Sequence, residues 1–196
     1  MEFAIKEENG FKFIDEGEGE VLLLLHGLMG ALSNWTDVVT EYTLNHQAEV
    51  KALVLTGSSG LYENAFGGSF PRRESYDFIK EKVEFTFHDP AIATKELVDE
   101  VYQIVNDRSK VIKILAMAKS AIRHNMSKDI HKIKVPVCLI WGKNDRITPP
   151  DVAIEFNELL PDSELYWVDE CGHAPMMEQP EKFNVYLKQF LDKHKE

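Results

Sequence analysis

The histidine best placed to move a proton is His173, within the segment CGHAP at positions 171–175. It follows the apolar run Leu165–Val168, so its imidazole is expected to project from a strand end into a cleft. Histidine, with an unperturbed pKa of about 6.5, can accept and return a proton near neutral pH. We therefore expect His173 to be a general base, the simpler alternative being a loop histidine bonded to backbone. Five other histidines lie in polar helical or loop sequence without metal-ligand spacing: His46, His88, His124, His131 and His194.

A carboxylate, Asp145, follows a second apolar run, Val135–Trp141, in the turn GKND at positions 142–145. If that run is a parallel strand, the turn lies at the carboxyl edge of the sheet, where α/β sheets bind ligands. A carboxylate at this edge can reach a histidine across it. An aspartate in a turn can also serve only as a cap, here before two prolines, and Asp162 and Asp169 are weaker alternatives for the acid.

The elements that must position these residues follow an α/β pattern. Uninterrupted apolar runs are typical of strands covered on both faces in a parallel sheet, and four occur: Val21–Leu25, Val50–Leu55, Val135–Trp141 and Leu165–Val168. Alternating apolar residues before them predict an N-terminal antiparallel hairpin that turns at Asn9-Gly10. Amphipathic spacing predicts helices over 33–46, over 152–160 and from Gln179-Pro180 to the C-terminus.

Between Ser58 and Lys134 the sequence loses strand-like runs and shows helical periodicity, which predicts a helical insertion. The segment 61–71 is aromatic and rich in glycine, as is typical of a mobile loop over a small-molecule pocket. In that interpretation Phe66 and Phe70 contact substrate, and Tyr76 and Phe78 would also suit an aromatic or acyl group. The alternative is a helical subdomain that only packs.

Composition narrows the partners and the location. A net charge of -11 leaves no basic stripe to neutralise phosphates, which argues against a nucleic-acid partner. No apolar run approaches a membrane span and no leader sequence is present at the N-terminus, so we expect a cytoplasmic protein without a membrane partner. Cys138 and Cys171 are expected to be free thiols, and no metal site is predicted. The expected partner is a small-molecule substrate.

Three motifs in order resemble the α/β-hydrolase superfamily, in the branch with a helical cap inserted after the sixth strand. They are an apolar strand entering HGLMG at positions 26–30, then CLIWGKNDRITPP, then LYWVDECGHAPMMEQPEKF. The resemblance covers nearly the whole chain. It implies hydrolysis of a small ester, amide or activated C–C bond by a Ser-His-Asp mechanism, with no metal or organic cofactor.

The resemblance also implies roles for particular residues. Asp145 orients His173 and stabilises its imidazolium form. The turn after the first apolar strand supplies the oxyanion hole, with the Leu28 N–H as donor and Gly27 leaving room for substrate. The alternative for Gly27 and Gly30 is a tight strand-to-helix turn without a chemical role.

The sequence departs from the family pattern at the nucleophile, because no Gly-x-Ser-x-Gly elbow occurs in the 196 residues. The helix at 33–46 resembles the start of one family helix joined to the tail of a later one, with a seam near positions 40–43. Three explanations remain open: a deletion that leaves impaired activity, a substitute nucleophile, or a non-catalytic binding or scaffold protein. Candidates for the substitute are Ser58, Ser59 and Cys171.

These observations predict an α/β fold with a mostly parallel sheet, an N-terminal antiparallel hairpin and helices on both faces. The core is expected over 1–57 and 135–196, and the helical cap over 58–134. Loss of two central strands should narrow the sheet to about six strands. We expect strand 21–25 to pair directly in parallel with strand 50–55.

Overall fold

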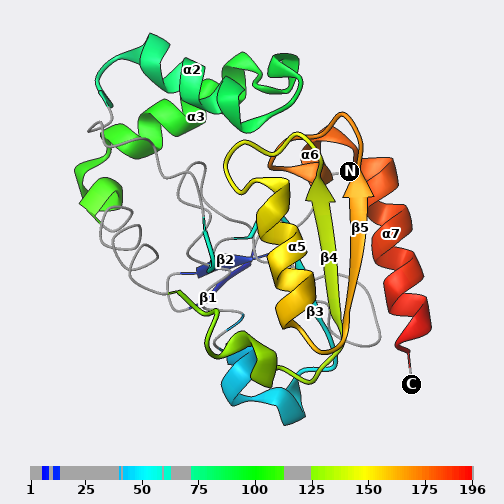
Figure 1. The fold of residues 1–196 in the computed structure, drawn as a ribbon. Coiled ribbons are helices and arrows are strands. Elements are labelled where there is room, and N and C mark those ends of the chain that lie inside the picture. The colour runs from blue at the N-terminus through cyan, green and yellow to red at the C-terminus, as the bar shows by residue number, and fades with distance from the viewer. Residues whose placement is uncertain are drawn as a thin grey trace.

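The computed structural model of this chain describes residues 6–8, 11–13, 40, 42–58, 60–62, 72–112 and 125–195. In this part of the chain β1 (Lys6–Glu8) and β2 (Phe11–Phe13) form an antiparallel hairpin. A parallel sheet has the order β3 (Leu53–Leu55), β4 (Val137–Gly142) and β5 (Ser163–Val168), as Figure 1 shows. The predicted hairpin and parallel sheet are therefore confirmed. The expected strand 21–25 and its pairing lie outside the described residues.

The register of the sheet brings the ends of β4 and β5 level with each other. Val137 lies opposite Ser163 at one end, and Gly142 lies opposite Val168 at the other. Because the two strands are parallel, the turns that follow them begin at the same carboxyl edge. This edge is where the predicted acid and base belong.

Helices cover both faces of the sheet, as predicted. Side chains of a strand alternate between faces, and in β4 Leu139 and Trp141 pack with α5 (Pro150–Leu159). The intervening residues Cys138 and Ile140 pack with α7 (Pro180–Lys193) on the opposite face. All of β4 is buried, which explains why its sequence is a continuous apolar run rather than an alternating one.

Helix α7 begins at Pro180, as the sequence predicted, whereas α5 begins at Pro150, two residues before its predicted start. Both α5 and α7 carry proline in the first turn, where a missing N–H costs nothing. A short helix, α6 (Pro175–Glu178), joins the turn after β5 to α7. Two 3-10 helices, η1 (Gln47–Glu49) and η3 (Ile130–Lys132), precede β3 and β4.

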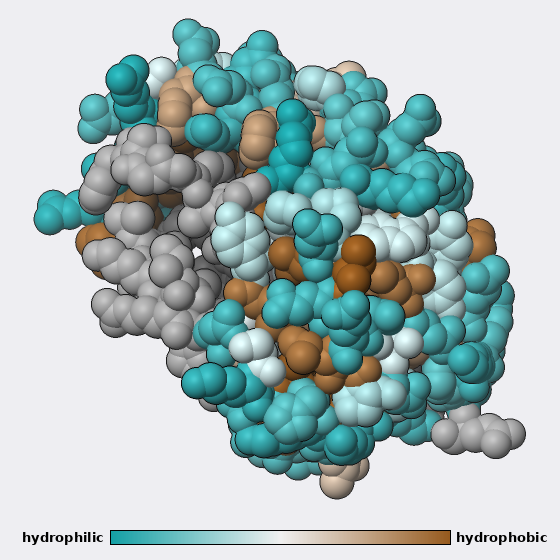
Figure 2. All heavy atoms as spheres, viewed as in Figure 1, coloured by the Kyte–Doolittle hydropathy of each residue, from teal (hydrophilic) through white to brown (hydrophobic). Residues whose placement is uncertain are grey.

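The described part of the insertion is helical. It contains α2 (Tyr76–Thr86), the 3-10 helix η2 (Pro90–Ile92) and α3 (Lys95–Asn106). Ser75 caps α2 and Thr94 caps α3, each hydroxyl accepting a backbone N–H at 3.3 Å. The two helices lie above the carboxyl edge of the sheet (Figure 1) and bury their apolar side chains against each other. Figure 2 shows mainly hydrophilic residues on their outer surface. The bounds expected for the core (1–57 and 135–196) and for the helical cap (58–134) stay a prediction.

Element boundaries differ from the sequence prediction in small ways. The strand predicted over 50–55 begins only at Leu53, whose N–H donates to Pro136 O at 2.9 Å and so makes the first bond to the neighbouring chain segment. The strand predicted from Val135 begins at Val137, because Pro136 has no N–H to give. Of the helix predicted over 33–46, residues 40 and 42–45 are described as helical, and His46 is described outside the helix.

No helix in the described part of the chain combines the length and apolar character that a membrane crossing requires. The described residues also contain no group of three or more His, Cys, Asp or Glu side chains that could hold a metal ion.

Candidate active site

Two turns at the carboxyl edge of the sheet lie directly against each other. The turn after β4 donates the Asn144 N–H to Cys171 O, in the turn after β5, at 2.9 Å. Gly142 makes this approach possible, because a Cβ there would lie 2.0 Å from Gly172 O and 2.4 Å from Cys171 O. No side chain fits in that space, so the glycine of the GKND turn is required by the contact.

These turns bring Asp145 and His173 together. The sequence analysis predicted that the two residues could meet at this edge. His173 Nδ1 lies 2.9 Å from Asp145 Oδ2, and the residues are 9% and 3% exposed. A carboxylate only accepts hydrogen bonds, so this contact places a proton on Nδ1. In the neutral ring Nε2 is then left with a lone pair, which is the state that a general base requires.

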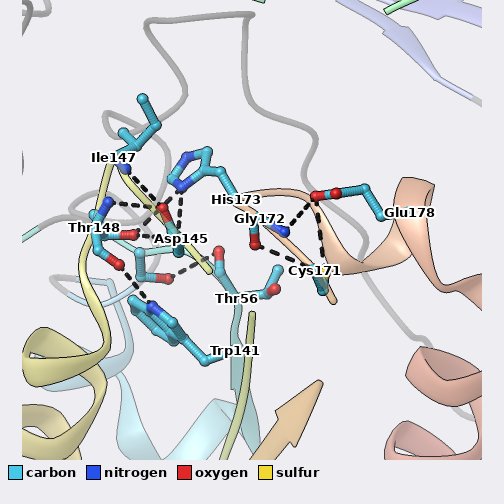
Figure 3. Close-up of polar contacts among 10 residues, drawn as sticks. Thr56, Trp141, Asp145, Ile147, Thr148, Cys171, Gly172, His173 and Glu178 are labelled. Atoms are coloured by element: carbon cyan, nitrogen blue, oxygen red, sulfur yellow. Dashed lines mark hydrogen bonds and ion pairs between the residues drawn. The ribbon is translucent and has the colours of Figure 1, made fainter. Parts of the chain in front are cut away.

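The buried carboxylate of Asp145 has a partner on each oxygen besides the histidine. Oδ1 accepts the backbone N–H groups of Ile147 and Thr148, at 2.8 and 2.9 Å. Oδ2 accepts the Thr148 hydroxyl at 2.8 Å. Figure 3 shows these bonds converging on the carboxylate. Burying an ionised carboxylate costs free energy unless hydrogen bonds replace those it made to water. The bonds from residues 147 and 148 therefore stabilise the buried Asp145 carboxylate.

Thr148 is a site residue that the sequence analysis missed. Its hydroxyl lies 2.8 Å from Asp145 Oδ2 and 3.3 Å from His173 Nδ1, and the side chain is fully buried. Trp141 Nε1 donates to Thr148 O at 2.9 Å and fixes the backbone of the turn to the core. The spacing Asp-x-x-Thr is the available signal, since an aspartate commonly accepts N–H groups two and three residues further on.

The end of β3 also contacts the histidine. Gly57 has a φ of +52°, and a Cβ on it would lie 2.6 Å from His173 O and 2.8 Å from His173 Nδ1. A glycine is therefore needed here both for its backbone conformation and for space. Three strand ends, of β3, β4 and β5, thus converge on one imidazole.

The geometry argues against Cys171 as a substitute nucleophile. Its thiol is buried, with Sγ 3.7 Å from Gly172 O and 3.8 Å from Glu178 Oε1. Figure 3 shows it extending toward Glu178 while the His173 ring extends toward Asp145. Burial, together with the Glu178 charge, raises the pKa of the Cys171 thiol to about 12. The thiolate, which is the reactive form, is therefore scarce at neutral pH.

The other predicted site residues lie in the loop after β3, in the insertion, or outside the described part of the chain. Ser58 is buried, and its hydroxyl lies 3.5 Å from Thr56 O, a long contact within its own loop. In the insertion, Tyr76 and Phe78 pack within the α2–α3 cluster. Five predicted site residues lie outside the described part of the chain: Gly27, Leu28, Ser59, Phe66 and Phe70.

Comparison with known proteins points to one family. The model of a family described as alpha/beta hydrolase fold matches residues 67–180. An alpha/beta hydrolase enzyme from a sediment metagenome of the Mar Chica lagoon, Morocco, is 43% identical; the match covers 87% of this chain and 60% of that one, with a TM-score of 0.60.

Two further hydrolases are also similar. A 2-hydroxy-6-oxo-6-(2'-aminophenyl)hexa-2,4-dienoic acid hydrolase of Metapseudomonas resinovorans is 27% identical over 184 residues, which are 90% of this chain and 61% of that protein. The structure of 2-hydroxy-6-oxo-6-phenylhexa-2,4-dienoate hydrolase from Rhodococcus shares the fold at 19% identity and a TM-score of 0.66, over 85% of this chain and 62% of that one. This chain therefore spans less than two thirds of either relative.

Proposed function

Because this chain belongs to the α/β hydrolase fold family, we propose that Asp145 and His173 form the acid–base half of a hydrolytic site. The reaction class is hydrolysis of a small ester, amide or activated C–C bond next to a carbonyl group. The observation that carries the proposal is the 2.9 Å contact between His173 Nδ1 and a buried carboxylate oxygen. A solvated loop histidine would not need a carboxylate that three hydrogen bonds from its own turn hold in place.

The pair supplies the two proton transfers that such a reaction needs. His173 Nε2 takes the proton of an attacking hydroxyl or water as its oxygen bonds to the carbonyl carbon. Asp145 stabilises the imidazolium that forms. The same Nε2–H then protonates the leaving group as its bond to the carbonyl carbon breaks, which restores the neutral histidine. No metal or organic cofactor takes part in these steps.

The similar proteins support a proposal for the substrate class. Two of them are named as hydrolases of 2-hydroxy-6-oxo-hexa-2,4-dienoic acids with an aromatic group at carbon 6. We propose a small carbonyl compound of this class for the present site. An aromatic and glycine-rich segment of the insertion, which includes Phe66 and Phe70, is the part of the sequence suited to an aromatic group.

The activity of this chain should be impaired relative to a complete hydrolase. The sequence holds no Gly-x-Ser-x-Gly elbow, Cys171 is a buried thiol, and the Ser58 hydroxyl lies against its own loop. A triad enzyme without its nucleophile retains roughly 10³- to 10⁴-fold acceleration over water. We therefore propose slow hydrolysis in which His173 activates water.

The test compares the unchanged protein with His173→Ala in the hydrolysis of p-nitrophenyl acetate and of 2-hydroxy-6-oxo-6-phenylhexa-2,4-dienoate. His131→Ala, an exposed histidine on η3, is the matched control. We expect a slow rate above buffer that falls at least about tenfold in His173→Ala only. Equal rates in all three proteins would contradict the proposal. Binding of the dienoate without any turnover would favour the alternative, a small-molecule-binding protein without chemistry.

A further inference from the structure

The end of helix α2, in the insertion, lies against the turn that carries the histidine. The His173 N–H donates to Thr86 O at 2.9 Å. The preceding Gly172 leaves no room between the two segments, since a Cβ there would lie 2.7 Å from both Thr86 O and His88 N. Ala174 packs within the α2–α3 cluster. The insertion is thus in direct contact with the backbone on each side of the His173 side chain.

A single carboxylate joins these two segments, and we call its two hydrogen bonds the Glu178 bridge. Glu178, the last residue of α6, accepts the Gly172 N–H through Oε1 at 2.8 Å and the His88 N–H through Oε2 at 2.7 Å. Gly172 forms the peptide next to His173, and His88 lies two residues beyond α2. Both of these backbone groups are hydrogen-bond donors, so each Glu178 oxygen must act as an acceptor. In an ionised carboxylate both oxygens are acceptors only, whereas a protonated one carries an O–H donor.

The turn that carries Asp145 also contacts the same part of the insertion, through Arg146. The guanidinium of Arg146 donates to Phe87 O at 2.8 Å and lies 4.5 Å from the centre of the Phe85 ring. Residues 85–88 therefore contact the turn of Asp145 through Arg146 and the turn of His173 through Glu178. A shift of either turn against the insertion would break one of these contacts.

We propose that Glu178 is a positioning residue for His173, because its carboxylate fixes the Gly172 peptide against residue 88 and so sets where the imidazole meets Asp145. This inference rests on the acid–base role proposed for His173 and deepens it. Glu178 does not belong to the acid–base pair itself, because its two oxygens accept the backbone N–H groups of Gly172 and His88. It acts on the histidine only through the backbone.

The variant Glu178→Gln tests the proposal. Glutamine has nearly the same shape but presents one oxygen and one NH₂ group. The NH₂ group would face a backbone N–H, so two donors would meet and that hydrogen bond would be lost. We expect amide hydrogen exchange at Gly172 or His88 to become at least about tenfold faster. We also expect the Nδ1–H proton resonance of His173 to move or broaden.

Two control variants separate positioning from general damage. His88→Ala removes a side chain but keeps the backbone N–H that Glu178 binds, and Glu181→Gln removes an exposed carboxylate on the adjoining helix α7. Neither should change the His173 resonances. Unchanged exchange at both amides in Glu178→Gln would show that the bridge is absent. Faster exchange with unchanged His173 resonances would show that Glu178 is only a structural link, and either result overturns the proposal.

A measurement on the unchanged protein covers the case in which Glu178→Gln does not fold. If the bridge exists, the amide shifts of Gly172 and His88 follow the protonation of the Glu178 carboxyl with one common midpoint, and different midpoints would overturn it. None of these readouts depends on hydrolysis. Failure of the His173-dependent activity would therefore refute the proposed function while leaving the bridge to be judged separately.

Discussion

The hydroxyl of Thr148 lies 2.8 Å from Asp145 Oδ2, the same oxygen that His173 Nδ1 contacts at 2.9 Å. Asp145 and His173 are thus joined by a third side chain, which belongs to the turn of Asp145. Because Thr148 is fully buried, water cannot replace its hydroxyl if that group is removed. The supporting hydrogen bond is therefore open to a clean test by substitution.

We predict that Thr148→Val lowers the free energy of unfolding by about 1–2 kcal/mol, because the buried carboxylate loses a donor without losing packing volume. The backbone bond from residue 148 to Oδ1 remains. Thr148→Ser, which keeps the hydroxyl, is the control, and urea unfolding is the measurement. Equal stability of Thr148→Val and the unchanged protein would show that the hydroxyl does not support Asp145.

Gly142→Ala should disrupt the contact between the two turns. The added Cβ would meet the carbonyl oxygens of Gly172 and Cys171 at 2.0 and 2.4 Å, and backbone cannot move aside as a flexible side chain can. We expect a loss of about 3 kcal/mol or more in unfolding free energy. Lys143→Ala, at the neighbouring exposed position, should behave almost like the unchanged protein. A stable Gly142→Ala protein would mean that the two turns lie further apart than the 2.9 Å bond from Asn144 N–H to Cys171 O requires.

Cysteine labelling tests whether Cys171 can serve as a nucleophile. With the pKa of its thiol raised to about 12 by burial and the Glu178 charge, its reaction with iodoacetamide at about pH 8 should be at least about 100-fold slower in the native protein than in concentrated guanidinium chloride. Cys138, whose thiol pKa burial also raises to about 12, is removed as Cys138→Ser to isolate the signal. Rapid native labelling of Cys171 would restore it as a candidate nucleophile.

Glu164 should make the C-terminal helix sensitive to acid. Its carboxylate accepts from Lys193 Nζ at 2.8 Å and lies 3.1 Å from His194 Nε2. The Lys193 hydrogen bond, with smaller contributions from His194 and Tyr166, lowers the pKa of Glu164 from 4.5 to about 2. A lowered pKa adds stability above the unfolded value of 4.5, and this stability is lost as the pH falls toward 2.

We therefore expect Glu164→Gln to be less stable than the unchanged protein at pH 7, by less than about 1 kcal/mol because the pair is partly exposed. The difference should shrink as the pH is lowered below 4.5. Urea unfolding at neutral and acidic pH measures it. A difference that stays constant with pH would rule out the ionised carboxylate as its cause.

The sequence was sufficient to predict the sheet and the pairing of Asp145 with His173, because both depend on strand ends. Continuous apolar runs identified β4 and β5, and parallel strands must carry their following turns to one edge. Thr148 and Glu178 were not predicted. Glu178 binds a peptide 90 residues earlier in the chain, and no local pattern encodes which distant backbone N–H group a carboxylate will meet.

The strand boundaries show the same limit on a smaller scale. The apolar run from Val50 extends before β3, but pairing begins only at Leu53, where the backbone reaches Pro136 O. Hydrophobicity predicts which segment is buried, whereas the ladder of hydrogen bonds depends on the partner strand. Strand existence was therefore predictable and strand length was not.

We propose that Asp145 and His173 form an acid–base pair in this chain although its sequence lacks the serine elbow. The most direct test is the nitrogen NMR spectrum of the His173 ring in the unchanged protein and in Asp145→Asn. We predict a neutral ring protonated on Nδ1, with a low-field Nδ1–H resonance that is lost or strongly shifted in Asp145→Asn. A ring protonated on Nε2, or one whose spectrum does not change in Asp145→Asn, would contradict the claim.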